Sequence, residues 1–184
     1  MAGERPGWRP GRWDRGRVRP AAVTELPAAA LILLVGPAGA GKSTWAARHF
    51  DRGQILESDH FRQLVAGDAA DQSATGDAFK ALHIIARARL RRGLTTVVDA
   101  TNLTVAARRA LLRIARQTAR PAVAVAFDVS LQRCLRQNAR RVGRAVPEAI
   151  VRRQQRAFPS ALARLPSEGY AAILHLRDAD VDLP

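Results

Sequence analysis

Short runs of consecutive apolar residues recur along the chain and are separated by longer segments of mixed polarity. Strands of a parallel sheet are buried on both faces, so they appear as continuous apolar runs rather than as alternating ones. Leu31–Val35 is the clearest example of such a run. The five predicted strands are Leu31–Val35, Gln54–Glu57, Thr95–Asp99, Ala122–Phe127 and Ala171–Leu176.

The segments between these runs predict helices, because their apolar residues recur every three or four positions. The predicted helices are Ser43–Phe50, Asp59–Val65, Asp77–Arg92, one that follows the N-cap Thr104, one that begins at Ser130, and one after Pro147. Residues 66–76 are expected to form a loop. Strands and helices that alternate in this order predict an α/β fold, a doubly wound parallel sheet flanked by helices.

Two of these helices carry well-defined apolar stripes. In the first, Asp77–Arg92, the stripe consists of Phe79, Leu82, Ala86 and Leu90. In the helix after Thr104, small and aliphatic residues are expected to face the core and five arginines to lie on the polar side or at the end. The expected core residues are Ala107, Ala110, Leu111 and Ile114, and the arginines are Arg108, Arg109, Arg113, Arg116 and Arg120.

The first 28 residues differ in composition from the rest, because their arginines alternate with proline and glycine and show no helical or strand period. We expect residues 1–28 to form a disordered arm and residues 29–184 to form one folded domain. Two interpretations of the arm stay open. It is either an inert extension or a segment that contacts nucleic acid through arginine and through stacking of Trp8 and Trp13.

The net charge bears on the class of binding partner. The 184 residues include 30 basic and 16 acidic side chains, for a net charge of +14. Such a field favours polyanionic partners and raises their encounter rate. Lys42 and Lys80 are the only lysines, and a composition rich in alanine and arginine also results from a GC-rich genome. Charge alone therefore leaves a nucleic-acid partner and a compositional bias both open.

Cysteine usage and hydropathy exclude several protein classes. The single cysteine, Cys134, excludes a disulfide framework and a thiolate metal cluster, and a small core residue is its expected role. The longest apolar run, Ala28–Val35, is too short to span a bilayer. With no apolar stretch behind the N-terminal arginines that would mark a secretory signal, we expect a cytoplasmic protein without a membrane segment.

A glycine-rich segment between the first strand and the first helix, Gly36–Thr44, matches the phosphate-binding P-loop pattern. Glycines let backbone N–H groups wrap the phosphates, and the helix N-terminus adds partial positive charge. Lys42 is expected to bridge the β- and γ-phosphates of ATP and Ser43 to bind Mg²⁺. The predicted nucleotide-binding residues are Gly36, Ala38, Gly39, Ala40, Gly41, Lys42, Ser43 and Thr44.

Acidic side chains follow two other predicted strands. Asp99 ends a strand, and strand C-termini surround the ligand crevice of an open α/β sheet, so Asp99 is expected to approach the metal through a water. Asp59 and Arg62 are three residues apart, so they share one face of a helical turn. They form either a surface ion pair of little energetic worth or a general base with a cation that holds the acceptor.

A third candidate segment is rich in arginine and runs from Arg133 to Arg156, with Glu148 as its only acid. A C-terminal lid of arginines over a triphosphate would stabilise transition-state charge. A solvated arginine face is the alternative for several of these side chains. His83, which lies beside the apolar stripe of its helix, is expected to have a packing or capping role.

Taken in order, these motifs resemble the kinase module of bacterial RNA-repair polynucleotide kinase-phosphatases and their phage relatives, over residues 31–176. The segments that carry the resemblance are the P-loop, Trp45–Phe50, Ser58–Arg62, Thr75–Phe79, Val97–Asn102, and Arg141 with Arg144. The Asp-x-x-Arg pair is the most specific of them, since many families share the P-loop.

The resemblance implies an ATP- and Mg²⁺-dependent P-loop NTPase fold whose kinase transfers the γ-phosphoryl group to a 5′-OH end of RNA or DNA. It assigns the general base to Asp59, the acceptor clamp to Arg62 and the lid to Arg141 and Arg144. One departure is Gln137, where the pattern predicts an arginine; the adjacent Arg136 is a candidate substitute. A separate phosphatase and ligase would complete a repair reaction.

Two rival functions stay open at this level. Related P-loop enzymes phosphorylate sugars, nucleotide-sugars or antibiotics, so a small-molecule kinase has the same scaffold. A nucleotide-gated RNA-binding protein without catalysis is a more distant alternative. The positive charge favours a nucleic-acid acceptor, and the combination of Lys42, Ser43, Asp59 and Asp99 favours catalysis.

Overall fold

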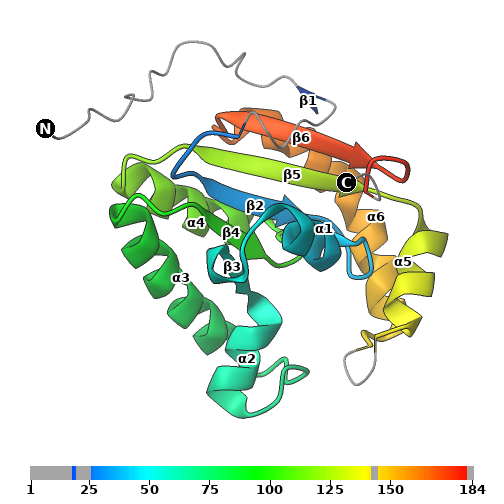
Figure 1. The fold of residues 1–184 in the computed structure, drawn as a ribbon. Coiled ribbons are helices and arrows are strands. Elements are labelled where there is room, and N and C mark those ends of the chain that lie inside the picture. The colour runs from blue at the N-terminus through cyan, green and yellow to red at the C-terminus, as the bar shows by residue number, and fades with distance from the viewer. Residues whose placement is uncertain (1–17, 20–25, 142–144, 182–184) are drawn as a thin grey trace, which may run out of the picture.

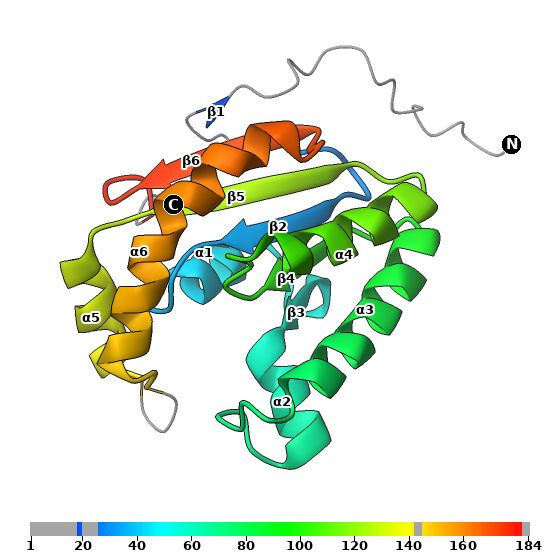
Figure 2. The ribbon, with the colours of Figure 1, turned by 180° about the vertical axis from the view of Figure 1, so that it is seen from behind.

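The structure is a computed structural model that describes residues 18–19, 26–141 and 145–181. Six parallel strands form one sheet in the order β1-β6-β5-β2-β4-β3, and helices lie on both of its faces (Figures 1 and 2). The strands are β1 (Val18–Arg19), β2 (Leu31–Val35), β3 (Ile55–Glu57), β4 (Thr96–Asp99), β5 (Ala122–Asp128) and β6 (Ala172–Arg177). The predicted doubly wound sheet is confirmed.

Six α-helices and two short 3₁₀ helices connect the strands in the described part of the chain. The α-helices are α1 (Lys42–His49), α2 (Ser58–Ala66), α3 (Thr75–Arg91), α4 (Val105–Gln117), α5 (Leu131–Ala139) and α6 (Glu148–Arg164), and the 3₁₀ helices are η2 (Arg52–Gln54) and η3 (Leu165–Ser167). None of the described helices is both long enough and apolar enough to span a membrane.

Alternate residues of the central strand β2 face two separate apolar cores. Leu31, Leu33 and Val35 pack with the buried residues of α3, α4 and α6. Ile32 and Leu34 pack on the other face with residues of α1 and α5. Every residue of β2 is buried, which explains its uninterrupted apolar sequence.

Residues 1–17 and 20–25 of the predicted arm lie outside the described residues. Five residues of the arm are described. Val18 and Arg19 form β1 and pair with Ile173 and Leu174 of β6, and residues 26–28 precede β2, with Leu26 packed against the core. Sequence periodicity gave no sign of this short strand. The disorder of the rest of the arm stays a prediction.

The helices agree with the predicted segments, with small differences in where they begin and in which residues of the apolar stripes are buried. Helix α3 begins at Thr75, two residues earlier than predicted, and Ala78 rather than Phe79 is its fully buried residue in the first turns. In α4, Leu111 and Ile114 are buried as predicted, and the side chain of Thr104 accepts a hydrogen bond from the Ala107 amide as an N-cap.

The prediction that all α4 arginines lie on the polar side is wrong for Arg108, which is fully buried. Its guanidinium makes a bidentate ion pair with Glu168, with Nε 2.7 Å from Oε2, and it also donates to the carbonyl oxygens of Asn102 and Leu103, both at 2.9 Å. A buried charge is tolerated only when it is paired and hydrogen-bonded, and Arg108 meets both conditions. The pair ties the loop after β4 to the segment before β6.

Removing Arg108 should therefore destabilise the fold far more than removing its neighbour Arg109, which is exposed. We expect Arg108→Ala to lower the free energy of unfolding by about 3–5 kcal/mol, because Glu168 is left as a buried unpaired charge. Arg109→Ala should change it by less than about 0.5 kcal/mol. Urea denaturation measures both, and equal midpoints for the two variants would contradict a structural role for the buried pair.

Candidate active site

The loop between β2 and α1 has the backbone geometry of a phosphate cradle. Gly39 and Gly41 adopt left-handed φ angles of 76° and 90°, which glycine alone adopts without strain. The amide groups of Gly39, Gly41, Lys42, Ser43 and Thr44 donate to no acceptor among the described residues. These free N–H groups and the N-terminus of α1 form a site for negatively charged oxygens.

The cradle is packed directly against helix α5. A Cβ atom at Gly39 would lie 2.1 Å from the carbonyl oxygen of Cys134, a distance at which the two atoms overlap. Cys134 is fully buried, as expected, and burial raises the pKa of its thiol to about 11. The thiol therefore stays protonated at neutral pH and serves as packing beside the loop.

Two P-loop amides are already hydrogen-bonded. The N–H of Ala38 donates to Oε1 of Gln154 on α6, at 2.8 Å, and the N–H of Ala40 donates to the carbonyl of Pro37, at 3.3 Å. Their predicted role as phosphate donors stays untested, and the free donors are the neighbouring amides. The sequence gave no signal for Gln154, because it lies 116 residues from Ala38 and belongs to no motif.

Lys42 is the first residue of α1 and is buried, with 8% of its surface exposed. Its ammonium donates to the carbonyl oxygens of Gly36 at 3.0 Å and of Pro37 at 2.7 Å. Burial lowers the pKa of Lys42 to about 8, and Asp99 partly opposes that shift. An ammonium held this way over the loop is available to a phosphate.

Asp99 ends β4, which pairs directly with β2 in the register Leu33–Val98. This register brings the Asp99 carboxylate beside the P-loop, near enough to the Ser43 hydroxyl for that group to act on its pKa. Burial raises the pKa of Asp99, while the charge of Lys42 and the Ser43 hydroxyl act in the opposite direction. The predicted proximity of Asp99 and Ser43 is present in the structure.

Ser43 and Asp99 offer the kind of oxygen ligands that Mg²⁺ prefers. Among the described residues, no group of three or more His, Cys, Asp or Glu side chains could hold a metal ion. The Ser43 and Asp99 oxygens suit Mg²⁺, which usually binds to one or two protein oxygens together with substrate phosphates and water.

Asp59 and Arg62 lie in the first two turns of α2, directly after β3, and form an ion pair. The pair is no ordinary surface contact, because only 10% of the Arg62 side chain is exposed and its Nε also donates to the Ala69 carbonyl at 2.7 Å. The Asp59 side chain remains 28% exposed. The charge of Asp59 acts on both Lys42 and Asp99, so it lies within electrostatic reach of the P-loop centre.

The arginine-rich segment is described only in part, because Arg144 lies outside the described residues. The charge of Arg141 acts on Lys42 and on Asp99, which puts it close to the same centre. Asn138 holds Val146 with two hydrogen bonds, of 2.7 and 3.0 Å, and so joins the two ends of the segment between them. Gln137 lies beside Gly41, because a Cβ atom built on Gly41 would be 3.5 Å from Oε1 of Gln137.

Comparison with known proteins shows the family of this fold. A family model described as an AAA domain matches residues 31–161. The chain belongs to this family. Among curated proteins, none matches the chain.

Solved structures that share the fold of this AAA-domain chain include a chain of the Pnkp1/Rnl/Hen1 RNA repair complex, with a TM-score of 0.64 and 19% identity. That match covers 79% of this chain and 49% of the other, so the AAA-domain chain spans about half the length of that relative. A sugar kinase from Janibacter sp. HTCC2649 has a TM-score of 0.57 and 18% identity, with 86% and 88% covered.

The APS kinase CysC of Mycobacterium tuberculosis also shares the fold, with a TM-score of 0.53, 17% identity, and 85% of this chain and 93% of that one covered. The AAA-domain chain therefore has a P-loop kinase fold, as the sequence predicts. The same fold accommodates several classes of acceptor, so the acceptor follows from the site rather than from the fold.

The contact between Gly39 and α5 leads to a matched test. Gly67 has a similar φ angle of 73° but no atom within 4 Å of a Cβ at that position. Gly67→Ala should cost only the left-handed strain of about 1–2 kcal/mol. Gly39→Ala adds an overlap with the Cys134 carbonyl and should displace the loop, so we expect it to abolish nucleotide binding. Thermal unfolding and binding of a fluorescent ATP analogue measure both effects, and equal behaviour would contradict the tight packing.

The lowered pKa of Lys42 predicts that nucleotide binding takes up protons. Below pH 8 the free protein already carries a charged Lys42, and above pH 8 it loses that proton. Phosphates favour the charged form, so uptake should approach about one proton per nucleotide at pH 9. Calorimetry in buffers of different ionisation enthalpy measures this proton uptake, and the substitution Lys42→Met should abolish the uptake. Equal uptake at pH 9 by wild type and Lys42→Met would contradict the assignment.

Proposed function

We propose that this protein is an ATP- and Mg²⁺-dependent polynucleotide 5′-hydroxyl kinase. The observation that carries the proposal is the Asp59–Arg62 ion pair, whose arginine is buried and whose carboxylate lies within electrostatic reach of the P-loop centre. A phosphotransferase needs a carboxylate to accept the proton of the attacking hydroxyl and a cation to position the acceptor. Asp59 and Arg62 supply both groups from one turn of α2.

In this proposal the nucleotide phosphates bind the free amides of the P-loop, and Lys42 holds the β- and γ-phosphates. Asp59 orients the 5′-hydroxyl and accepts its proton as the oxygen attacks the γ-phosphorus, and ADP leaves on the opposite side. Arg62 positions the acceptor strand. Arg141 and Arg144 stabilise the charge on the transferred group, and water exclusion strengthens that effect.

Ser43 and Asp99 would hold Mg²⁺, with Asp99 acting through a water. The Mg²⁺ ion supplies charge neutralisation at the phosphate oxygens when it is bound. Burial of Asp99 supports this role, because a buried carboxylate that faces Ser43 and Lys42 is poised to interact with a cation.

Net charge supports a nucleic-acid acceptor. A formal charge of +14 attracts polyanions, whereas a neutral sugar gains nothing from it. The fold shared with a chain of an RNA repair complex is in keeping with this acceptor class. A cytoplasmic enzyme that restores 5′-phosphate ends would act together with a separate phosphatase and ligase.

The proposal is tested by transfer of labelled γ-phosphate from ATP to a 5′-OH oligonucleotide, in parallel with a panel of sugars, nucleosides and adenosine phosphosulfate. We expect labelled oligonucleotide and no labelled metabolite. Transfer to one of the metabolites alone would replace the proposal with a small-molecule kinase. Nucleotide-dependent RNA binding without transfer would favour the binding protein.

Asp59→Asn should separate nucleotide binding from chemistry. The amide keeps the size of the carboxylate but accepts no proton, so kcat on an oligonucleotide should fall about 10²–10⁴-fold while the affinity for ATP changes little. Lys42→Ala should instead impair both. The matched control is Asp51→Asn, at an exposed carboxylate after α1, which should leave both quantities unchanged. Equal kcat for Asp59→Asn and wild type would overturn the base assignment.

A further inference from the structure

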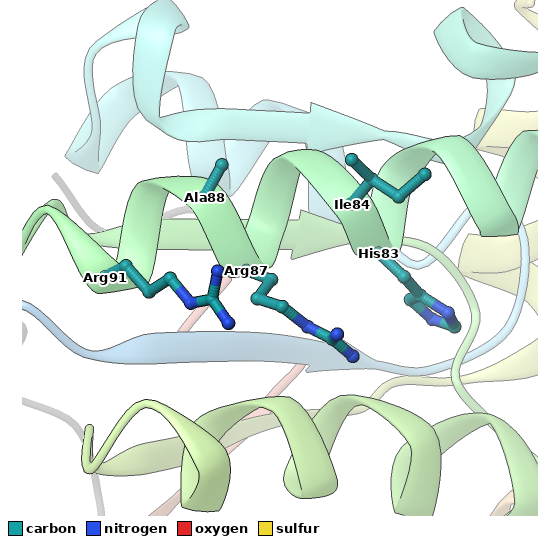
Figure 3. Close-up of a pocket in the computed structure, with 5 residues that line it drawn as sticks. All are labelled: His83, Ile84, Arg87, Ala88 and Arg91. Atoms are coloured by element: carbon teal, nitrogen blue, oxygen red, sulfur yellow. The ribbon is translucent and has the colours of Figure 1, made fainter.

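Helix α3 carries a row of side chains that the proposed chemistry does not use. Phe79, His83, Arg87 and Arg91 follow one another at intervals of four residues and therefore lie along one side of the helix. The last three line a surface cavity of about 270 Å³ together with Ile84 and Ala88. Figure 3 shows His83, Arg87 and Arg91 extending from the same side of α3, toward the ribbon of α4.

Both arginines of this row are exposed and make no hydrogen bond or ion pair with any described residue. Other arginines nearby are engaged: Arg89 bonds to Thr95 and Thr96, and Arg120 bonds to the Leu90 carbonyl. Arg87 and Arg91 are thus charged groups that pair with no carboxylate among the described residues.

No carboxylate lies nearby in the sequence to neutralise this surface. Between Ala78 and Phe127 the chain has ten basic residues and one acid, Asp99, which is buried at the P-loop. Arg109 and Arg113 of α4 are exposed on the neighbouring helix and have no ion pair within the described part of the chain. On α3 itself the exposed carboxylate is Asp77, in the first turn, and it pairs with Lys80. The surface beyond that turn is positively charged, which favours an extended polyanion over a protein partner with mixed charge.

The row begins close to the acceptor pair. Helix α3 starts beside α2, which carries Asp59 and Arg62, and packs against it (Figures 1 and 2). Arg87 is twelve residues beyond the start of α3, about 18 Å along the axis. Arg87 and Arg91 are separated by about 6 Å, a step comparable to that between phosphates of an extended strand.

We propose that the exposed side of α3, defined by His83, Arg87 and Arg91, binds the backbone of the single-stranded acceptor downstream of the reacting 5′ end. This inference rests on the proposed function and extends it. The contacts are ionic and independent of base sequence, because the row presents guanidinium groups, while its two aromatic rings, Phe79 and His83, are half-buried and pack against each other. A dinucleotide acceptor is too short to reach Arg87, whereas a 20-mer passes both arginines.

The length of the acceptor therefore tests the proposal. Arg87→Gln/Arg91→Gln removes two charges and keeps a good helix former at each position. We expect this variant to raise the KM for oligo(dT)20 on the order of tenfold and to leave the KM for a thymidine dinucleotide unchanged. The slope of log affinity for oligo(dT)20 against log salt should fall by about 1.4, since each phosphate on a single strand contributes about 0.7.

The matched control is Arg48→Gln/Arg164→Gln, which removes the same charge from exposed positions on α1 and at the end of α6. It should leave the KM of both acceptors unchanged. An equal rise for dinucleotide and 20-mer would show that the α3 arginines act on the fold or on the reaction centre and would overturn the inference. No rise for either acceptor would also overturn it.

Binding measured without ATP separates this inference from the proposed function. Fluorescence anisotropy of labelled oligo(dT)20 reports on the surface even if no phosphate is transferred. Binding that depends on Arg87 and Arg91 without transfer would support the α3 surface and refute the kinase assignment. Transfer with affinity independent of both arginines would support the kinase and refute the surface.

Discussion

The buried ammonium of Lys42 sets the conditions for the rest of the site. A charge removed from water must be compensated by nearby dipoles or by opposite charge. Here two carbonyl groups of the P-loop compensate it directly, and Asp99 compensates it at longer range. That arrangement requires the loop to curl over its own first helical turn, and the left-handed glycines make the curl possible.

The parallel pairing of β2 with β4 places Asp99 within reach of this charge, and three hydrogen-bonded links hold the neighbouring loops in position. The amide of Gly36 donates to the Thr101 carbonyl, Asn102 donates to the Leu34 carbonyl, and Arg108 holds the Asn102 carbonyl. The P-loop and the loop after β4 are thus fixed to each other through one backbone amide and two side-chain donors. Fixed dipoles of this kind are the preorganisation that electrostatic catalysis needs.

Sequence patterns predicted what depends on neighbours along the chain. The P-loop, the strand that ends at Asp99, and the pair Asp59 and Arg62 are local patterns, and each lies where its pattern placed it. Contacts between distant segments had no such signal. The partner of Arg108 lies 60 residues away, and without it an arginine on an amphipathic helix is expected to face water. For the same reason, the bond from Gln154 to Ala38 and the short strand β1 were missed.

The row of arginines on α3 and the single lysine of the P-loop respond to different variables. A guanidinium keeps its charge far above neutral pH, whereas Lys42 titrates near pH 8. In the proposed kinase, alkaline pH would therefore lower the affinity for the phosphates of ATP. It would leave the electrostatic attraction between the α3 arginines and a nucleic-acid strand unchanged. Salt would act mainly on the exposed arginines, because buried charges are screened much less. In the proposed kinase, pH would therefore control binding of the phosphate donor, and ionic strength would control binding of the acceptor strand.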